Sequence, residues 1–411
     1  MAMPRWLRIP NHDALHRTVT LTRISVLGIP RTASIPSWPS TTPRILTHGR
    51  EYHVEGLMLA PVIFSGLFVS LWTWKCFMMV TFQNKIIYMP GLPPNARGEK
   101  IQDYASRCAG IQWREERVRA TDGTDLALCV TDVDLGPSAL SSPNDPNDLR
   151  PPSATSAQPG VAFYILYFQG NASSIPPRLP DLSSVLSMLK RHSLQWDARK
   201  IRCTMVCLSY RGYWTSRGRP TERGLNIDAA AAVNWISQIH HDSYGGGAHS
   251  SRTSAKLILW GQSIGAGVAT NLASLTPMPA DIHLDSLVLE TPFTSIRAML
   301  EVLYPQKWLP YRHLWPFLRN HLDSWQNIGT ISQKYRTAES SPEILILEAA
   351  KDELVPPELG QKLYERCLDV KLPVTRKAVA GAFHNDVLFR AEGRRAVSDF
   401  LSRRMRSSRG Y

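Results

Sequence analysis

The chain has 411 residues, 43% of them hydrophobic, which is enough to bury one large core and leaves room for one or two domains. Its 47 Lys and Arg residues exceed its 34 Asp and Glu residues, and much of the excess lies near the two ends. Basic ends suit an anionic membrane surface or simple solvation as well as nucleic acid, and no nucleic-acid-binding motif is present, so no nucleic-acid partner is expected. The six Cys residues show neither a Cys-x-x-Cys pair nor zinc spacing, so we expect buried free thiols and no metal site.

Residues 1–55 form a basic segment without sustained hydrophobic periodicity. They contain seven Arg and three acidic residues, together with many Ser, Thr and Pro. This composition favours a disordered tail, although a presequence or an artefact of gene modelling would have a similar composition.

Residues 56–80 are predicted to be a membrane anchor. No charged residue occurs from Gly56 to Trp74, and apolar side chains surround the whole segment instead of forming one face. About twenty such residues cross the hydrocarbon core of a bilayer, and the aromatic residues beside Lys75 are typical of its interface. We predict a single-pass protein of the endoplasmic reticulum or plasma membrane. Basic residues on both flanks leave the orientation open, and a buried core helix is the alternative.

A β-hairpin is predicted next. Two strand-like runs, 111–120 and 124–133, flank the turn sequence Asp122-Gly123. Residues 135–160 follow, with six Pro and five Ser, and this composition indicates a disordered insertion between two strands.

After Gly160, short apolar runs alternate with helical patterns. This alternation predicts an α/β fold with a mostly parallel central sheet and helices on both faces, in which functional groups gather at the carboxyl ends of the strands. One such domain is expected over residues 81–404, and residues 405–411 are expected to be a basic tail. The predicted strands are residues 161–168, 201–208, 255–260, 284–289, 344–348 and 374–379, and the predicted helices include 182–189, 225–239 and 266–273.

The run Gly261-Gln262-Ser263-Ile264-Gly265 joins one of these strands to the following helix. This context is typical of a nucleophile elbow, in which a serine occupies a strained corner. Small residues two positions either side avoid collisions with the neighbouring strand and helix, and both positions are Gly here. We therefore predict that Ser263 is a catalytic nucleophile.

A serine hydroxyl is a weak nucleophile at neutral pH and needs a histidine base that an acid orients. Asp352 follows the strand 344–348 and His384 follows the strand 374–379, so both should lie at the same sheet edge as Ser263. The chain order Ser, acid, His is the one that this arrangement uses. Glu290, which follows another strand, is a less favoured alternative to Asp352.

The negative oxygen that develops during acyl transfer needs two backbone donors. The amide of Ile264, at the start of a helix, is expected to be one of them. The other should come from the loop after strand 161–168, where Gly170 permits a sharp turn and Asn171 is placed to donate. The glycosylation sequon at Asn171 is discounted, because a glycan there would block the site.

These motifs resemble the membrane-anchored α/β-hydrolase-domain proteins, over roughly residues 56–402. The resemblance implies an α/β-hydrolase fold and hydrolysis of lipid-like esters or thioesters, since the family includes monoacylglycerol lipases and protein depalmitoylases. One departure is Gln169, where the family usually has His; because backbone amides bind the oxyanion, activity is expected to survive. The matching stretches are 168–172, 210–213, 224–229, 261–265, 291–295 and those around Asp352 and His384, preceded after the anchor by 82–90.

Other candidate residues are given less weight. Arg211 could contact substrate, but pairing with a neighbouring loop acid is favoured. His240, His241 and His249 have irregular spacing in a Gly-rich region, which favours a solvated loop over a metal site.

The aromatic-rich stretch 299–317 is either a cap that lines an acyl pocket or an ordinary packed helix pair. In the first case the substrate-binding residues would be Trp308, Trp315 and Phe317.

The favoured hypothesis is a membrane-anchored serine hydrolase without metal or cofactor that acts on a lipid or acylated-protein substrate. Ser263 attacks the acyl carbon, His384 takes and returns the proton, and Asp352 orients His384. Two alternatives remain: a non-catalytic scaffold, suggested by Gln169 and the basic ends, and an aminopeptidase-like hydrolase, for which the sequence shows no acidic amine pocket. The sequence does not indicate an oligomeric state.

Overall fold

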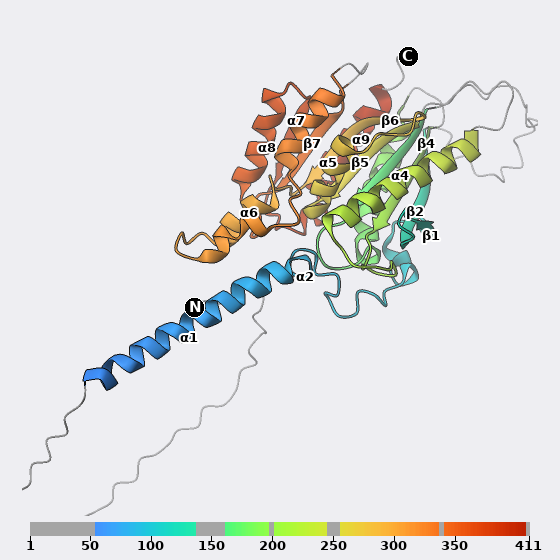
Figure 1. Cartoon of the computed structure of the whole chain (residues 1–411). Helices are drawn as coiled ribbons and strands as arrows, with labels where there is room; N and C mark the ends of the chain where they lie inside the picture. The colour runs from blue at the N-terminus through green and yellow to red at the C-terminus, as the bar shows by residue number, and fades with distance from the viewer. Residues whose placement is uncertain (1–53, 137–160, 197–200, 245–254, 337–340, 408–411) are drawn as a thin grey trace, which may run out of the picture. The chain divides into compact units, whose positions relative to one another are not determined.

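The structure is a computed structural model that describes residues 54–136, 161–196, 201–244, 255–336 and 341–407 (Figure 1). The predicted disorder of residues 1–55 and 135–160 falls almost entirely outside these ranges. Three predicted borders are wrong. Helix α1 (Val54–Thr81) already begins at Val54, inside the segment predicted to be disordered. Leu135 is the fully buried last residue of a strand, and residues 405–407 continue the last helix, with Met405 buried, instead of starting a tail.

In the described part of the chain, one sheet of eight strands has the order β1-β2-β4-β3-β5-β6-β7-β8. β2 is antiparallel to β1 and β4, which confirms the predicted hairpin, and every later pair is parallel. The predicted α/β-hydrolase fold class is therefore confirmed. The strands are β1 (Arg114–Arg119), β2 (Asp125–Leu135), β3 (Ala162–Phe168), β4 (Ile201–Ser209), β5 (Ala255–Gln262), β6 (Ile282–Glu290), β7 (Glu343–Ala349) and β8 (Val374–Val379).

Helices cover both faces of this sheet (Figure 1). Two helices pack on one face, α3 (Leu179–Ser193) and α9 (Ala391–Ser407). Four pack on the other: α4 (Glu222–Tyr244), α5 (Ile264–Leu275), α7 (Ser324–Lys334) and α8 (Pro357–Asp369). All seven side chains of β3 are buried, as expected for a strand with helices on both sides. His240 and His241 lie in α4 and not in the loop predicted for them, whereas His249 lies outside the described residues.

The described part of the chain divides into two units between Val62 and Ile63. The described part of the first unit is the start of helix α1 (Val54–Thr81), which continues into the second. Between Met58 and Thr81 this helix contains a window of mean hydropathy 1.5, none of which is buried. By length and composition, α1 can therefore cross a membrane, and no other helix in the described ranges meets that criterion.

Candidate active site

Ser263 occupies the corner between β5 and α5, with φ 52° and ψ −115°. A positive φ is uncommon for a residue with a side chain, and the corner is fixed by the Ser263 amide, which donates to the carbonyl of Glu290 at 2.8 Å. A Cβ atom on Gly261 would lie 2.1 Å from the carbonyl oxygen of Gly265, and one on Gly265 would lie 2.2 Å from that of Phe168. Only glycine fits these two positions.

His384 lies between Ser263 and Asp352. Its Nε2 atom is 3.0 Å from the Ser263 hydroxyl, and its Nδ1 atom is 2.9 and 3.0 Å from the two carboxylate oxygens of Asp352. The side chains of His384 and Asp352 are 2% and 4% exposed, so little water competes for these hydrogen bonds. The structure thus brings together three residues that the sequence separates by up to 121 positions.

The loop after β7 holds this arrangement through its backbone. Asp352 Oδ1 accepts from the amides of Leu354 and Val355 at 2.9 and 2.8 Å. The amide of His384 donates to the carboxylate of the adjacent Glu353 at 3.0 Å. Both the carboxylate and the imidazole therefore have fixed positions relative to the sheet edge.

Glu290, the alternative acid, has a different set of contacts. Its fully buried carboxylate pairs with Arg178 and accepts from the indole nitrogen of Trp260 at 3.2 Å. Burial alone would lower the pKa of the Arg178 guanidinium, but Glu290 and the other groups around it raise that pKa above its usual value. In the part of the chain that the structure describes, Glu290 makes no hydrogen bond with His384.

The two predicted oxyanion donors lie in different elements. Ile264 is the first residue of α5, so its amide has no acceptor within the helix. Asn171 follows β3, and among the described residues its amide donates to no hydrogen bond. Both amides thus remain available as donors.

Gln169, two residues before Asn171, is 4% exposed. Neither polar atom of its side chain has a hydrogen-bond partner among the described residues, which is costly for a buried amide. Its carbonyl, in contrast, accepts from the hydroxyl of Tyr210 at 3.0 Å. Gln169, which departs from the family pattern, is therefore buried beside the candidate site. Its side chain is unpaired among the described residues, and its backbone carbonyl is fixed by Tyr210.

A contact that the sequence did not predict fixes the Asn171 loop. The next two residues, Ala172 and Ser173, have φ values of 58° and 61°, and their amides donate to the carbonyls of Tyr88 and Leu92. The carbonyl of Tyr88 also accepts from the hydroxyl of Tyr213. The segment that follows α1 therefore holds the Asn171 loop through its backbone carbonyls. A main-chain acceptor leaves no signal in residue type, which is why this role was missed.

The three predicted substrate-binding aromatics face outward. Trp308 is 76% exposed, Trp315 43% and Phe317 60%, and the stretch that contains them consists of one short helix and two 3₁₀ turns. This arrangement is not a packed helix pair, and the role of the three residues in substrate binding stays a prediction. None of the three contacts the residues around Ser263 through a described hydrogen bond.

The favoured expectation for Arg211 is confirmed. Its guanidinium donates to Asp122 in the hairpin turn at 2.7 Å and to the buried carboxylate of Asp228 in α4 at 2.7 and 2.9 Å. Burial raises the pKa of Asp228, and the hydrogen bonds from Arg211 oppose that rise. Arg211 thus joins the hairpin to α4 and stays clear of Ser263.

The described cysteines are free, and five of the six are buried. Burial raises the pKa of the Cys203 and Cys367 thiols to about 12, so neither is a reactive nucleophile. Within the described ranges, no group of three or more His, Cys, Asp or Glu residues is placed to hold a metal ion.

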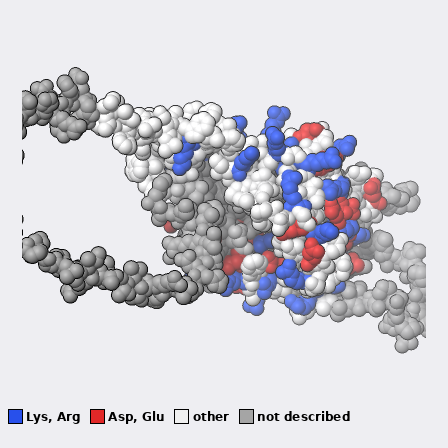
Figure 2. Space-filling model, turned by 90° about the horizontal axis from the view of Figure 1, so that it is seen from below, with Lys and Arg blue, Asp and Glu red and all other residues white. Residues whose placement is uncertain are grey.

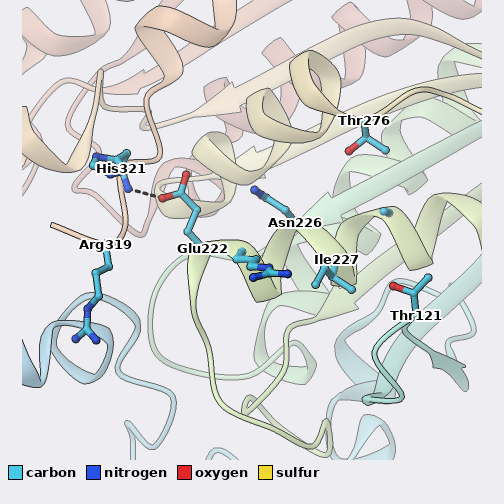
Figure 3. A pocket seen from close by; sticks show the side chains of 9 residues that line it. Thr121, Glu222, Asn226, Ile227, Thr276, Arg319 and His321 are labelled. Atoms are coloured by element: carbon cyan, nitrogen blue, oxygen red, sulfur yellow. Dashed lines mark hydrogen bonds between the residues drawn. The ribbon is translucent and has the colours of Figure 1, made fainter.

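An open cavity of about 500 Å³ lies at the first turns of α4 (Figure 3). None of Ser263, His384 and Asp352 lines it. The Glu222 carboxylate at its edge points toward His321 and accepts from the backbone amides of His321 and Leu322 and from the side chain of Asn271. Its main acidic group therefore serves the fold, and the cavity is separate from the candidate active site.

Comparisons with known proteins give a consistent picture, although no family model matches the chain. The lysophosphatidylserine lipase ABHD12 of Danio rerio is 36% identical over 210 residues, which are 49% of this chain and 46% of that protein. The α/β hydrolase domain-containing protein WAV2 of Arabidopsis thaliana is 26% identical over 70% of this chain and 77% of that protein. The chain spans about half the length of the first curated relatives it matches.

Among solved structures, an α/β hydrolase of Vibrio vulnificus aligns with a TM-score of 0.49 and 16% identity, over 78% of this chain and 91% of that one. Among the sequence relatives, an uncharacterized membrane protein of Saccharomyces cerevisiae is 30% identical over 49% of this chain and 62% of its own length. The sequence relatives confirm the resemblance seen in the motifs, and the chain is a homologue of the α/β-hydrolase-domain proteins.

Proposed function

We propose that the protein is a membrane-anchored serine hydrolase that cleaves carboxylic esters or thioesters of lipid-like acyl groups. The observation that carries this proposal is the line of hydrogen bonds from Ser263 through His384 to Asp352, which starts at the strained corner of the sheet. A hydroxyl 3.0 Å from an imidazole nitrogen is within proton-transfer reach, and the buried carboxylate stabilises the imidazolium that forms.

In the proposed cycle, the Ser263 oxygen bonds to the acyl carbon while His384 Nε2 takes the hydroxyl proton. The amides of Ile264 and Asn171 donate to the oxyanion of the tetrahedral intermediate. The bond from the acyl carbon to the alcohol or thiol then breaks, and His384 returns its proton to the leaving group. A water molecule, deprotonated by the same nitrogen, releases the acid and restores Ser263.

Lipid substrates are favoured because the domain follows a helix that can cross a membrane and because a relative is named as a lysophosphatidylserine lipase. Acyl glycerols, lysophospholipids and palmitoylated proteins all present the same acyl carbon, and we place lipid esters first. The endoplasmic reticulum or the plasma membrane is the proposed location.

A fluorophosphonate probe tests the chemistry directly, because it reacts with activated serines. The full-length protein should be labelled, and Ser263→Ala should not. Ser286→Ala is the matched control, since Ser286 is buried in β6 and its hydroxyl has no hydrogen-bond partner among the described residues, so labelling should be unchanged. A folded wild-type protein without label would instead favour the non-catalytic scaffold.

A series of p-nitrophenyl esters from acetyl to palmitoyl tests the substrate class. Each methylene buried by the enzyme contributes about 0.8 kcal/mol, so kcat/KM should rise roughly threefold to fourfold per methylene while the binding surface lasts. An aminoacyl anilide and a palmitoylated peptide are measured beside the series. Fastest turnover on the anilide would support an aminopeptidase instead, and fastest turnover on the peptide a depalmitoylase.

A further inference from the structure

Residues 296–321 leave the sheet edge after β6 and return before α7. They contain α6 (Ile296–Leu303) and two 3₁₀ turns, η5 (Pro310–His313) and η6 (Trp315–Phe317). The two ends meet, because the amide of Ile296 donates to the carbonyl of His321 at 2.8 Å. We refer to this closed excursion as the aromatic loop.

Large apolar side chains of the aromatic loop are exposed although the loop is well bonded internally. Leu303, Trp308 and Phe317 are 57%, 76% and 60% exposed. The Arg312 guanidinium donates to the carbonyl of Pro305 at 3.1 Å, and His313 Nε2 lies 3.0 Å from the carbonyl of Lys307. The exposed side chains therefore belong to a loop with a defined conformation. Several large apolar side chains exposed on one folded segment are typical of an interaction site.

The aromatic loop also contacts the last turns of α1. The Lys75 ammonium lies 4.8 Å from the ring centroid of Tyr311. The guanidinium of Arg319 donates to the carbonyls of Val80 and Thr81 at 3.0 and 3.1 Å, which satisfies the end of the helix. The side chain of Gln83 donates to the carbonyl of Phe317 at 3.1 Å.

These contacts fix the level of the loop relative to a bilayer. The uncharged run Gly56–Trp74 rises about 28 Å as a helix, close to the ~30 Å thickness of the hydrocarbon core. The candidate span Met58–Thr81 continues for about two turns beyond Lys75, so Lys75 lies near the end of the span and near the boundary between hydrocarbon and headgroups, toward which a Lys side chain directs its charge. Tyr311, which contacts Lys75, lies at that same boundary.

Charge on the aromatic loop agrees with this position. It carries four basic residues, Arg297, Lys307, Arg312 and Arg319, and one acidic residue, Glu301. Figure 2 shows the face seen from below, where Lys and Arg side chains lie beside uncharged surface, with Asp and Glu side chains among them. Basic residues around exposed tryptophans suit the headgroup region of a leaflet that contains anionic lipid.

We infer that the aromatic loop is a second membrane contact, with Leu303, Trp308 and Phe317 inserted among the headgroups of the leaflet that α1 leaves. The inference relies on α1 as the membrane span and deepens the proposed function. The loop starts six residues after Glu290, whose carbonyl holds the corner of Ser263. The loop therefore leaves the sheet at the strand ends that carry the nucleophile.

The test measures the depth of single labelled positions in the full-length protein in liposomes of phosphatidylcholine and phosphatidylserine. Cys76→Ser is the background, because the other five cysteines are buried. An NBD fluorophore is attached at Trp308→Cys or Phe317→Cys and, as the matched control, at Leu275→Cys. Leu275 is 64% exposed and ends α5, which starts at Ile264 beside Ser263 and leads to the start of β6, at the amino ends of the parallel strands.

Insertion at a depth of about 5–10 Å predicts blue-shifted emission and quenching by doxyl-labelled lipid at least about threefold stronger at positions 308 and 317 than at 275. Equal, weak quenching at all three positions overturns the inference, and so does release of the protein by alkaline carbonate, because α1 would then not be a span. Fluorophosphonate labelling of the same sample reports separately on the proposed hydrolase, so either idea can fail alone.

Discussion

The corner around Ser263 and the aromatic loop are connected through β6, yet their residues are constrained in opposite ways. At the corner, backbone atoms leave no room for even one additional carbon at Gly261 or Gly265. In the aromatic loop, most of the surface of Trp308 is exposed. Packing within the protein therefore restricts which residues fit at the corner. By our inference, contact with lipid restricts which residues suit the aromatic loop.

The largest expected effect is on chemistry at the corner. Ser263→Ala and His384→Ala should each lower kcat by at least about 10⁴-fold, and the double variant should lose little more, because the members of a triad act as a unit. Asp352→Asn should lose somewhat less than either. Initial rates on a p-nitrophenyl ester measure this, and a Ser263→Ala rate above about a tenth of wild type would make the triad assignment wrong.

The next effect is on stability at the same corner. Gly261→Ala should lower the free energy of unfolding by at least about 3 kcal/mol, because the new methyl group would overlap backbone atoms of α5 that cannot move aside. Gly98→Ala is the control, since its Cβ would lie 3.6 Å from Asn95 in ordinary contact. Thermal denaturation of both variants measures the difference, and equal melting temperatures would contradict the steric account of the corner.

An intermediate effect is expected where the segment after α1 meets the site. Tyr213→Phe removes the hydroxyl that donates to the Tyr88 carbonyl and should lower stability by about 1 kcal/mol. Because that carbonyl also holds the Asn171 loop, kcat should fall several-fold while KM stays constant.

Tyr164→Phe provides the comparison for Tyr213→Phe. It removes a buried hydroxyl that contacts His240 in α4, so stability should fall while kcat is kept. Equal kcat values in the two variants would show that the Tyr213 bond is only structural.

The smallest effect is expected in the aromatic loop. Trp308→Ser should change the free energy of unfolding in detergent by less than about 0.5 kcal/mol, because little of the indole is buried in the protein. Trp196→Ser is the matched control, since Trp196 is only 4% exposed and its loss should be strongly destabilising. A large loss of stability for Trp308→Ser would mean that packing within the protein fixes the aromatic loop, as it fixes the corner around Ser263.

Sequence reasoning worked where local sterics restrict the residue types. The strands were found because buried parallel strands are continuously apolar, and the corner was found because its geometry admits only glycine beside Ser263. Asp352 and His384 were placed correctly at the sheet edge because strand ends are marked in the sequence. The catalytic roles of these residues stay predictions until the variants are measured.

The features that were missed depend on main-chain atoms or on long-range packing. The carbonyls of Tyr88 and Leu92 hold the Asn171 loop, and a carbonyl is the same in every residue type. His240 was assigned to a loop because of the Gly-rich sequence after it, whereas tertiary packing extends α4 through Tyr244. The outward orientation of Trp308 could not be deduced from its apolar character, which is equally typical of a pocket.

The hydrogen bonds from Ala172, Ser173 and Tyr213 to the Tyr88–Leu92 segment define which part of the anchor region is exchangeable. A chimera that replaces α1 with an unrelated span should keep the hydrolase intact if the junction lies before Phe82. A junction just before β1 would remove both acceptor carbonyls and leave three donors beside the candidate oxyanion site unpaired. The functional border of the domain is therefore the end of α1, well before the first strand of the sheet.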